Sequence, residues 1–284
     1  MSILTKYRVL NFKRLIIVNL FLVGAFLSCF FLSGLYEVTL GFDFNASDIA
    51  NNPYKMQQTL LEQVKRMDRY TDINMFTTTV FPILVFSTGL FFYREKVGVF
   101  PYLFLRKKSQ IKEVGKAMFF HSLFSAVSFY LAYIVFMTIG YCYIGPVTGD
   151  VPRNLFDGIF GTGFSFQHIY SYYLLEGFYK YFVFSFIYSL FVCCIALLVR
   201  RQYLCMVVPI CYYFGVNIVI GNNAILGSIL LPFQPAYTLG FNGMVYDNPN
   251  ILTALKPLLP FIPILIFICI GIGYYTKRSE RVEF

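Results

Sequence analysis

Six long apolar stretches without a single Asp, Glu, Lys or Arg determine what this chain can fold into. Each is long enough for a hydrocarbon core, which needs roughly 18 to 25 such residues. Lipid offers no water to unpaired backbone groups, and the alternating pattern of a barrel strand is absent, so these stretches must be helices. The sequence predicts an all-α membrane protein with six transmembrane helices. The six stretches are 15–36, 75–93, 117–144, 181–199, 203–220 and 257–275.

The composition supports a membrane class and argues against a nucleic-acid partner. The chain is 58% hydrophobic and 13% charged, whereas about a quarter of the residues in soluble domains are charged. Its net charge of +9 would suit nucleic acid only with a basic face on a folded soluble module, and no such module is visible. Retention of Lys and Arg on the cytoplasmic side of a membrane explains the excess.

The distribution of basic residues predicts the orientation. With the N-terminus in the cytoplasm, six spans return the C-terminus there, and 16 of the 23 Lys and Arg residues then lie inside. The positive-inside rule therefore predicts that both termini are cytoplasmic. The inner loops are 94–116 and 200–202, and the outer loops are 37–74, 145–180 and 221–256. The whole chain, 1–284, is interpreted as one transmembrane domain.

Three segments outside the spans have patterns of their own. The start of the chain, 1–14, carries four basic residues and is expected to lie as an amphipathic helix at the inner surface. Residues 51–70 begin with a helix-start signal and place apolar residues on one face, which predicts a surface helix. The short apolar stretch 224–233 suits a broken or re-entrant segment before the last span better than a further span.

No motif predicts catalysis, a metal or a cofactor on this chain. HExxH, GxSxG and GxxxxGK[ST] are absent, so ATP hydrolysis is not expected here and the chain is not interpreted as an enzyme. The predicted spans contain no charged residue that could couple transport to an ion gradient. Asn19, Asn217 and His121 are expected to make polar contacts between helices. Glu176 and Lys180, just outside the fourth predicted span, are expected to reach interfacial water.

The first inner loop concentrates charge around a Gly and a Pro. Its sequence, with the end of the second span, is FFYREKVGVFPYLFLRKKSQIKEVGK (91–116). This run, an aromatic-Arg-Glu-Lys start followed by Gly, an aromatic-Leu pair and a basic stretch, resembles the cytoplasmic loop of type-2 ABC exporter permeases. The order of the six spans and the broken segment before the last one are also similar to that family. The chain departs from common members in its long first outer loop, 37–74, and in its lack of Trp.

The resemblance implies a coupling helix between spans 2 and 3 that docks on a separate ATP-binding subunit. Two copies of that subunit, which would hold ATP and Mg²⁺, and a second permease, identical or homologous, are the implied partners, in addition to the bilayer. The protein would lie in the cell membrane, and its richness in Phe, Tyr, Ile and Asn suits a low-GC bacterium. The implied docking and coupling residues are Arg94, Glu95, Lys96, Gly98, Pro101, Tyr102, Leu103, Arg106, Lys107, Arg200 and Arg201.

Two functions from different classes remain open at this level. The first is a permease that moves a hydrophobic or amphipathic cargo, such as a peptide, lipid or drug. The second is a non-transporting sensor or immunity protein that binds an amphipathic peptide at its outer loops. An ATPase partner separates the two, because only the permease needs energy from another subunit.

Overall fold

The computed structural model is all-helical over the residues that it describes, with no strand among them. This confirms the predicted class. The predicted N-terminal amphipathic helix lies almost wholly outside the described residues, as do most of the surface helix 51–70 and part of the segment 224–233. The structure describes residues 12–39, 54, 67–71, 73, 76–98, 100, 110–144, 153–223, 227, 229–240 and 246–280.

Five helical segments of the described chain are long and apolar enough to cross a membrane, and a sixth is made of two helices that meet at a bend of 52°. The protein is therefore a multi-pass membrane protein. The five are Lys13–Leu32, Phe76–Gly98, Ile111–Tyr143, Ile169–Leu198 and Leu204–Asn222, and the bent pair is Ile251–Leu258 with Phe261–Lys277.

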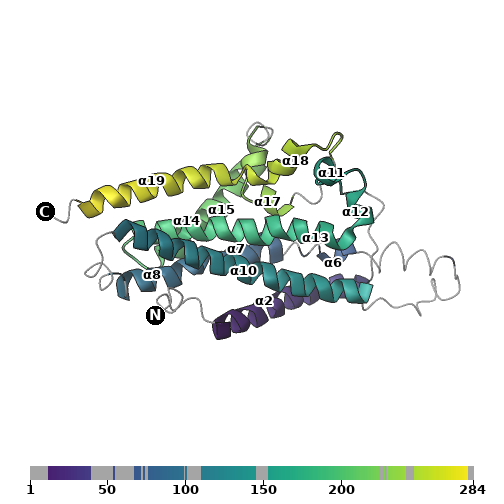
Figure 1. The fold of residues 1–284 in the computed structure, drawn as a ribbon, viewed down its shortest axis with the longest axis horizontal. Helices are drawn as coiled ribbons and strands as arrows, with labels where there is room; N and C mark the ends of the chain where they lie inside the picture. Colours follow the sequence, from purple (N-terminus) through teal and green to yellow (C-terminus); the bar gives the residue numbers. More distant parts are fainter. Residues whose placement is uncertain are drawn as a thin grey trace.

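The helix α14 (Phe184–Leu198) lies at the centre of the bundle. It packs against the neighbouring helices α8, α10, α15 and α19, and α10 also packs against α2 (Figure 1). In the most apolar stretch of the segment that ends with α14, 67% of the residues are buried, against 22% in the segments that hold α2 and α15. These two peripheral helices therefore present most of their apolar side chains outward. The neighbours are α2 (Phe12–Leu32), α8 (Thr88–Gly98), α10 (Gln110–Ile144), α15 (Leu204–Asn222) and α19 (Phe261–Glu280).

Shorter elements complete the described chain. They include α7, which has Pro82 in its first turn, and two segments wound with the wider π-helical turn, η2 and η3, which continue directly into α7 and α14. The shorter elements are α3 (Leu35–Thr39), α6 (Met67–Thr71), η2 (Phe76–Val80), α7 (Phe81–Phe86), α11 (Asp157–Phe160), α12 (Phe164–Gln167), α13 (Ile169–Gly177), η3 (Phe178–Val183), η4 (Leu231–Phe233), α17 (Tyr237–Gly240), α18 (Ile251–Leu255) and η6 (Lys256–Leu258).

Aromatic rings fill the space between α2, η2, α10 and η3. Phe26 on α2 lies with its ring centre 4.0 Å from that of Phe76 and 5.3 Å from that of Phe136 on α10. Tyr133 on α10 stacks on Tyr181 at 4.5 Å. Such pairs contribute beyond the area they bury, so the high Phe and Tyr content of the sequence is used for packing between helices.

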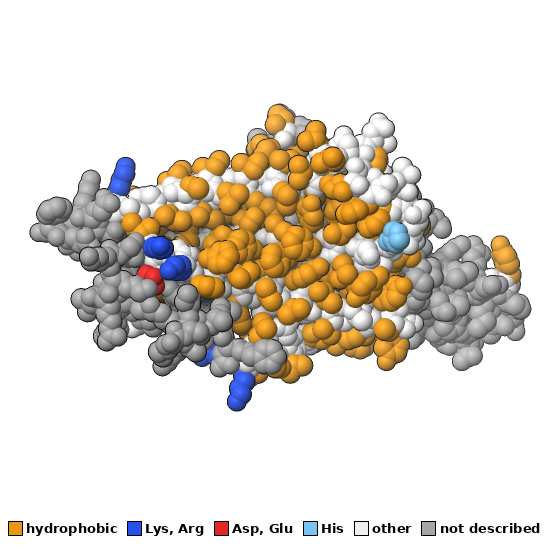
Figure 2. Space-filling model, viewed as in Figure 1, with side chains coloured by type: hydrophobic (Ala, Val, Ile, Leu, Met, Phe, Trp, Pro, Cys, Tyr) orange, Lys and Arg blue, Asp and Glu red, His pale blue; other side chains and the backbone are white. Residues whose placement is uncertain are grey.

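The outer surface carries a broad band of hydrophobic side chains over the middle of the bundle (Figure 2). Lys and Arg gather at the end where α8 and α14 finish and α10 begins, which is the left end of Figures 1 and 2. We call this the basic end. The opposite end carries α6, α11, α12 and α18 and is called the capped end. The belt between them is what a bilayer covers.

The helices extend further than the sequence indicates. α8 continues to Gly98 and α10 begins at Gln110, so both ends of the predicted loop 94–116 are helical. With 35 residues, α10 is roughly 52 Å long at 1.5 Å per residue and exceeds a hydrocarbon core of about 30 Å. The fourth apolar segment starts at Ile169 instead of 181. It therefore contains Glu176 and Lys180, which hydropathy alone places in a loop.

Candidate functional site

The predicted docking residues are described at two places, and both lie at the basic end. Arg94, Glu95 and Lys96 occupy the last two turns of α8, which ends at Gly98. Arg200 and Arg201 form the connection from α14 to α15, and both are exposed. The remaining predicted residues lie outside the described part of the chain; they are Pro101, Tyr102, Leu103, Arg106 and Lys107.

Glu95 ties α8 to α10. Its Oε2 atom lies 2.9 Å from Nε2 of His121, and the two side chains are only 18% and 3% exposed. The His121 ring also packs edge-on against Phe92, one turn before the carboxylate. This hydrogen bond holds the last turn of α8 against α10 about three turns after α10 begins at Gln110.

Lys96 ties α8 to the end of α14. Its Nζ donates to the carbonyl oxygens of Ala196, Leu197 and Val199 at 2.8, 2.8 and 2.9 Å. The last carbonyls of a helix have no partner within it and carry partial negative charge. A lysine from a different helix therefore caps the C-terminus of the central helix.

Tyr93 adds a second contact with the same region. Its hydroxyl donates to the carbonyl oxygen of Arg200, and the Lys96 ammonium lies 5.4 Å from the centre of its ring. The end of α8 is thus joined through Tyr93 and Lys96 to the end of α14 and to Arg200, which follows it. We call the set Tyr93, Glu95, Lys96 and His121 the brace.

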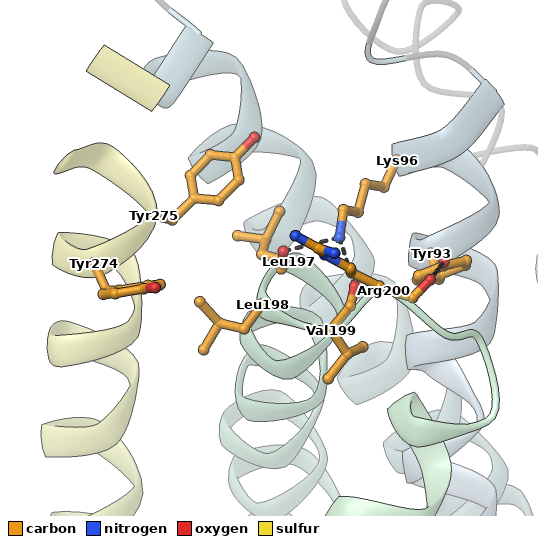
Figure 3. Close-up of a pocket in the computed structure, with 8 residues that line it drawn as sticks. All are labelled: Tyr93, Lys96, Leu197, Leu198, Val199, Arg200, Tyr274 and Tyr275. Atoms are coloured by element: carbon orange, nitrogen blue, oxygen red, sulfur yellow. Dashed lines mark hydrogen bonds between the residues drawn. The ribbon is translucent and has the colours of Figure 1, made fainter. Parts of the chain in front are cut away.

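A cavity of about 340 Å³ opens beside the brace (Figure 3). The C-terminal turn of α14 forms its floor, α8 one wall and the end of α19 the other. Its lining combines two cations, three tyrosines and three aliphatic residues and includes no acidic residue in the described part of the chain. The lining residues are Tyr93, Lys96, Leu197, Leu198, Val199, Arg200, Tyr274 and Tyr275.

A buried ionic cluster lies in the half of the bundle towards the capped end. Oε1 of Glu176 accepts from Nζ of Lys180 at 2.6 Å, and Oε2 accepts from Arg153 at 3.1 Å. The exposed fractions of the Glu176, Lys180 and Arg153 side chains are 2%, 6% and 17%. The expectation that Glu176 and Lys180 extend to water is wrong, because each finds an opposite charge inside the bundle.

The capped end is held by hydrogen bonds between segments that are far apart in sequence. Asn154 donates to the carbonyl of Tyr246 and accepts from its backbone N–H at 2.9 Å. Asn250 begins α18 with a capping box in which its side chain and that of Thr253 satisfy each other's backbone N–H groups. The described parts of the segments 145–180 and 221–256, which the sequence predicts as outer loops, therefore pack together at this end.

Of the three residues predicted to make polar contacts between helices, two join different elements and one bonds within its own helix. Asn217 on α15 accepts from the backbone N–H of Ala236 at 3.1 Å, which joins α15 to the segment before α17. His121 joins α10 to α8 through Glu95. Asn19 donates to Leu15 in its own helix at 2.9 Å, which is a local bond within α2.

The sequence singled out Glu95, Lys96 and His121, but it did not predict that Glu95 pairs with His121 or that Lys96 binds the end of α14. No local signal links Lys96 to carbonyls some hundred residues later, since backbone carbonyls carry no sequence identity. Arg153 and Tyr93 were likewise not singled out. No local signal links Arg153 to Glu176, which lies 23 residues later in the sequence.

Comparison with known proteins yields no match, whether with protein-family models, with curated proteins or with solved structures.

Proposed function

We propose that this chain is the membrane-spanning permease subunit of an ATP-driven, ABC-type exporter. In this proposal the basic end faces the cytoplasm, and residues 99–109 between α8 and α10 carry the coupling helix. A separate ATP-binding subunit docks there and on Arg200 and Arg201. The cargo is a hydrophobic or amphipathic molecule such as a peptide, lipid or drug.

The observation that carries the proposal is the brace. A displacement of the end of α8, which leads into residues 99–109, is passed to α10 through Glu95 and His121 and to the end of α14 through Lys96. Packed helices and short hydrogen bonds transmit displacement because cores are close-packed and deform little. A loop whose only task is to orient the protein in the membrane needs basic residues, but it does not need its base tied to two other helices.

The chain offers no energy source of its own for transport. The sequence has no nucleotide-binding loop, and Glu176 and Lys180 within the fourth apolar segment are bonded to each other. Energy would therefore arrive from a partner at the basic end. The poorly buried helices α2 and α15 leave apolar faces at the periphery on which a second permease subunit could pack.

Gentle solubilisation of native membranes, capture of this chain and identification of co-purifying proteins test the proposal. A protein with a nucleotide-binding loop is expected to remain bound to the wild-type chain. This ATPase is expected to be lost from the double variant Glu95→Ala, Tyr102→Ala. Glu95→Ala removes the bond from α8 to His121, and Tyr102→Ala removes a predicted docking residue. Lys256→Ala is the control, because it removes a charge at the capped end.

Retention of the ATPase by wild type and control, and its loss from the double variant, would support the permease. Absence of any ATPase from a folded wild-type sample would contradict it. A peptide bound to the wild-type chain without an ATPase would instead favour the sensor or immunity alternative and direct attention to the cap.

A further inference from the structure

The cavity beside the brace exists because α14 ends while α19 continues past it. α14 finishes at Leu198, and Val199 turns the chain into extended backbone, whereas α19 runs on to Glu280. Gly271 lets the two helices approach closely just before this point, since a Cβ there would lie 2.5 Å from the Cys194 sulfur. Beyond this contact the cavity opens, with Tyr274 and Tyr275 on one side and Tyr93 and Lys96 on the other.

The charge in the cavity is positive. Lys96 directs its ammonium at the carbonyl groups that end α14 and so offsets the negative end of that helix. In Figure 3 the Arg200 side chain lies across the cavity floor between Lys96 and Leu197. Arginine offers a planar fork of donors that matches the oxygens of a phosphate. An anionic group in this cavity is therefore attracted and not repelled.

One wall of the cavity is continuous with the apolar belt. Tyr274 is 60% exposed, and Ile270 and Ile266 follow at intervals of four residues on the same face of α19, 67% and 55% exposed. Tyrosine at the boundary between the belt and a charged rim is the usual arrangement at a membrane interface. A molecule held by its polar group in the cavity can thus lay an apolar tail along α19 without leaving the lipid.

We propose that this cavity is a binding site for the phosphate headgroup of an anionic phospholipid, with Arg200 as the main contact and the Tyr274–Ile270–Ile266 face of α19 receiving an acyl chain. The volume of about 340 Å³ lies at the lower end of the range for small-molecule sites, which suits a headgroup and not a whole lipid. Basic pockets between membrane helices are known to hold such headgroups. The inference does not depend on an ATPase partner.

Native mass spectrometry of the purified full chain, titrated with phosphatidylglycerol or phosphatidylcholine of matched acyl chains, tests the site. Phosphatidylglycerol is expected to bind more tightly, because the choline cation of the other lipid opposes Arg200 and Lys96. Arg200→Gln is expected to weaken phosphatidylglycerol binding about tenfold, as the loss of one charge-assisted contact does. Arg201→Gln is the matched control, since this neighbour bonds Tyr203 and does not line the cavity.

Two further arms distinguish the origin of the phosphate and the path of the tail. Soluble glycerol phosphate is expected not to displace the lipid at equal concentration, because it lacks the tail that packs on α19. Tyr274→Ala leaves the charges in place and is expected to weaken both lipids. Equal losses in Arg200→Gln and Arg201→Gln, no preference between the lipids, or displacement by glycerol phosphate at equal concentration would each overturn the proposal. Unchanged binding by Tyr274→Ala would overturn the assignment of the tail to α19.

Discussion

Removal of the Glu176 carboxylate is the sharpest test of how the bundle is held together. Glu176 lies on α13, within the fourth apolar segment, and accepts from both Lys180 and Arg153. The substitution Glu176→Ala leaves two cations in the bundle without the anion that both contact. Lys180 is the more affected, because its side chain is only 6% exposed, whereas that of Arg153 is 17% exposed.

The expected loss of stability is large because Glu176→Ala removes the anion of a buried ion pair and leaves the cation in place. Removal of one partner of a buried pair typically destabilises a protein by about 3 to 5 kcal/mol, since the remaining charge is left in a medium of low dielectric constant. The partial exposure of Arg153 reduces the cost on its side. We therefore expect Glu176→Ala to lower the free energy of unfolding by about 3 kcal/mol. Lys180→Met, which leaves Glu176 bonded to Arg153, is expected to cost less than half as much.

Reversible unfolding in mixed micelles, followed by circular dichroism as the fraction of denaturing detergent rises, measures both values. The double variant Glu176→Ala with Lys180→Met is expected to be more stable than Glu176→Ala alone, because the most buried cation is then gone. A wild-type-like stability of Glu176→Ala would refute the reasoning. So would strict additivity in the double variant, since the two groups would then not interact.

Two smaller changes test packing and capping by the same unfolding assay. Gly177→Ala places a Cβ 1.9 Å from the Tyr133 ring and is expected to cost about 1 to 3 kcal/mol by overpacking. Gly215→Ala in α15, where a Cβ meets nothing within 4 Å, is its control and is expected to be neutral or stabilising; equal effects would contradict the packing argument. Lys96→Met removes three hydrogen bonds to the end of α14 and is expected to cost about 1 to 2 kcal/mol, discounted for partial exposure. Lys277→Met, an exposed charge at the same end, is expected to change stability by less than about 0.5 kcal/mol, and a loss as large as that of Lys96→Met would refute the capping role.

Hydropathy predicted the number and type of the membrane helices well, because length and apolar composition are properties of a local stretch. It placed the start of the fourth segment twelve residues late for a physical reason. A hydropathy window counts Glu176 and Lys180 as two charges that must stay in water, and it has no means of knowing that Glu176 bonds both Lys180 and Arg153 inside the bundle. The error is therefore confined to the place where tertiary pairing reverses the cost of burial.

The candidate site likewise has parts that a local sequence pattern predicts and parts that depend on tertiary contacts. The charge pattern around 94–96 and the pair Arg200–Arg201 were visible in the sequence, because basic residues after apolar runs stand out. The brace was not visible, since Lys96 binds backbone carbonyls and Glu95 reaches a histidine 26 positions later. The cavity was not visible either, because it depends on where α14 stops relative to α19. The part of the coupling segment with Pro101, Tyr102 and Leu103 lies outside the described residues, so its predicted docking role stays a prediction.

The two ends of the bundle are fixed in different ways, and the central helix takes part in both. At the basic end, Lys96 holds the C-terminus of α14 through side-chain-to-backbone bonds that are partly open to water. Towards the capped end, the helical segment that runs into α14 is held by buried charges that include Arg153 from the cap. Water competes more with the former contacts than with the bond between Glu176 and Lys180, which are 2% and 6% exposed, so the C-terminus of α14 is the softer of the two attachments. In the proposed transporter, a displacement that begins at residues 99–109 would therefore move the basic ends of α8 and α14 first, while the cap and the buried cluster stay in place.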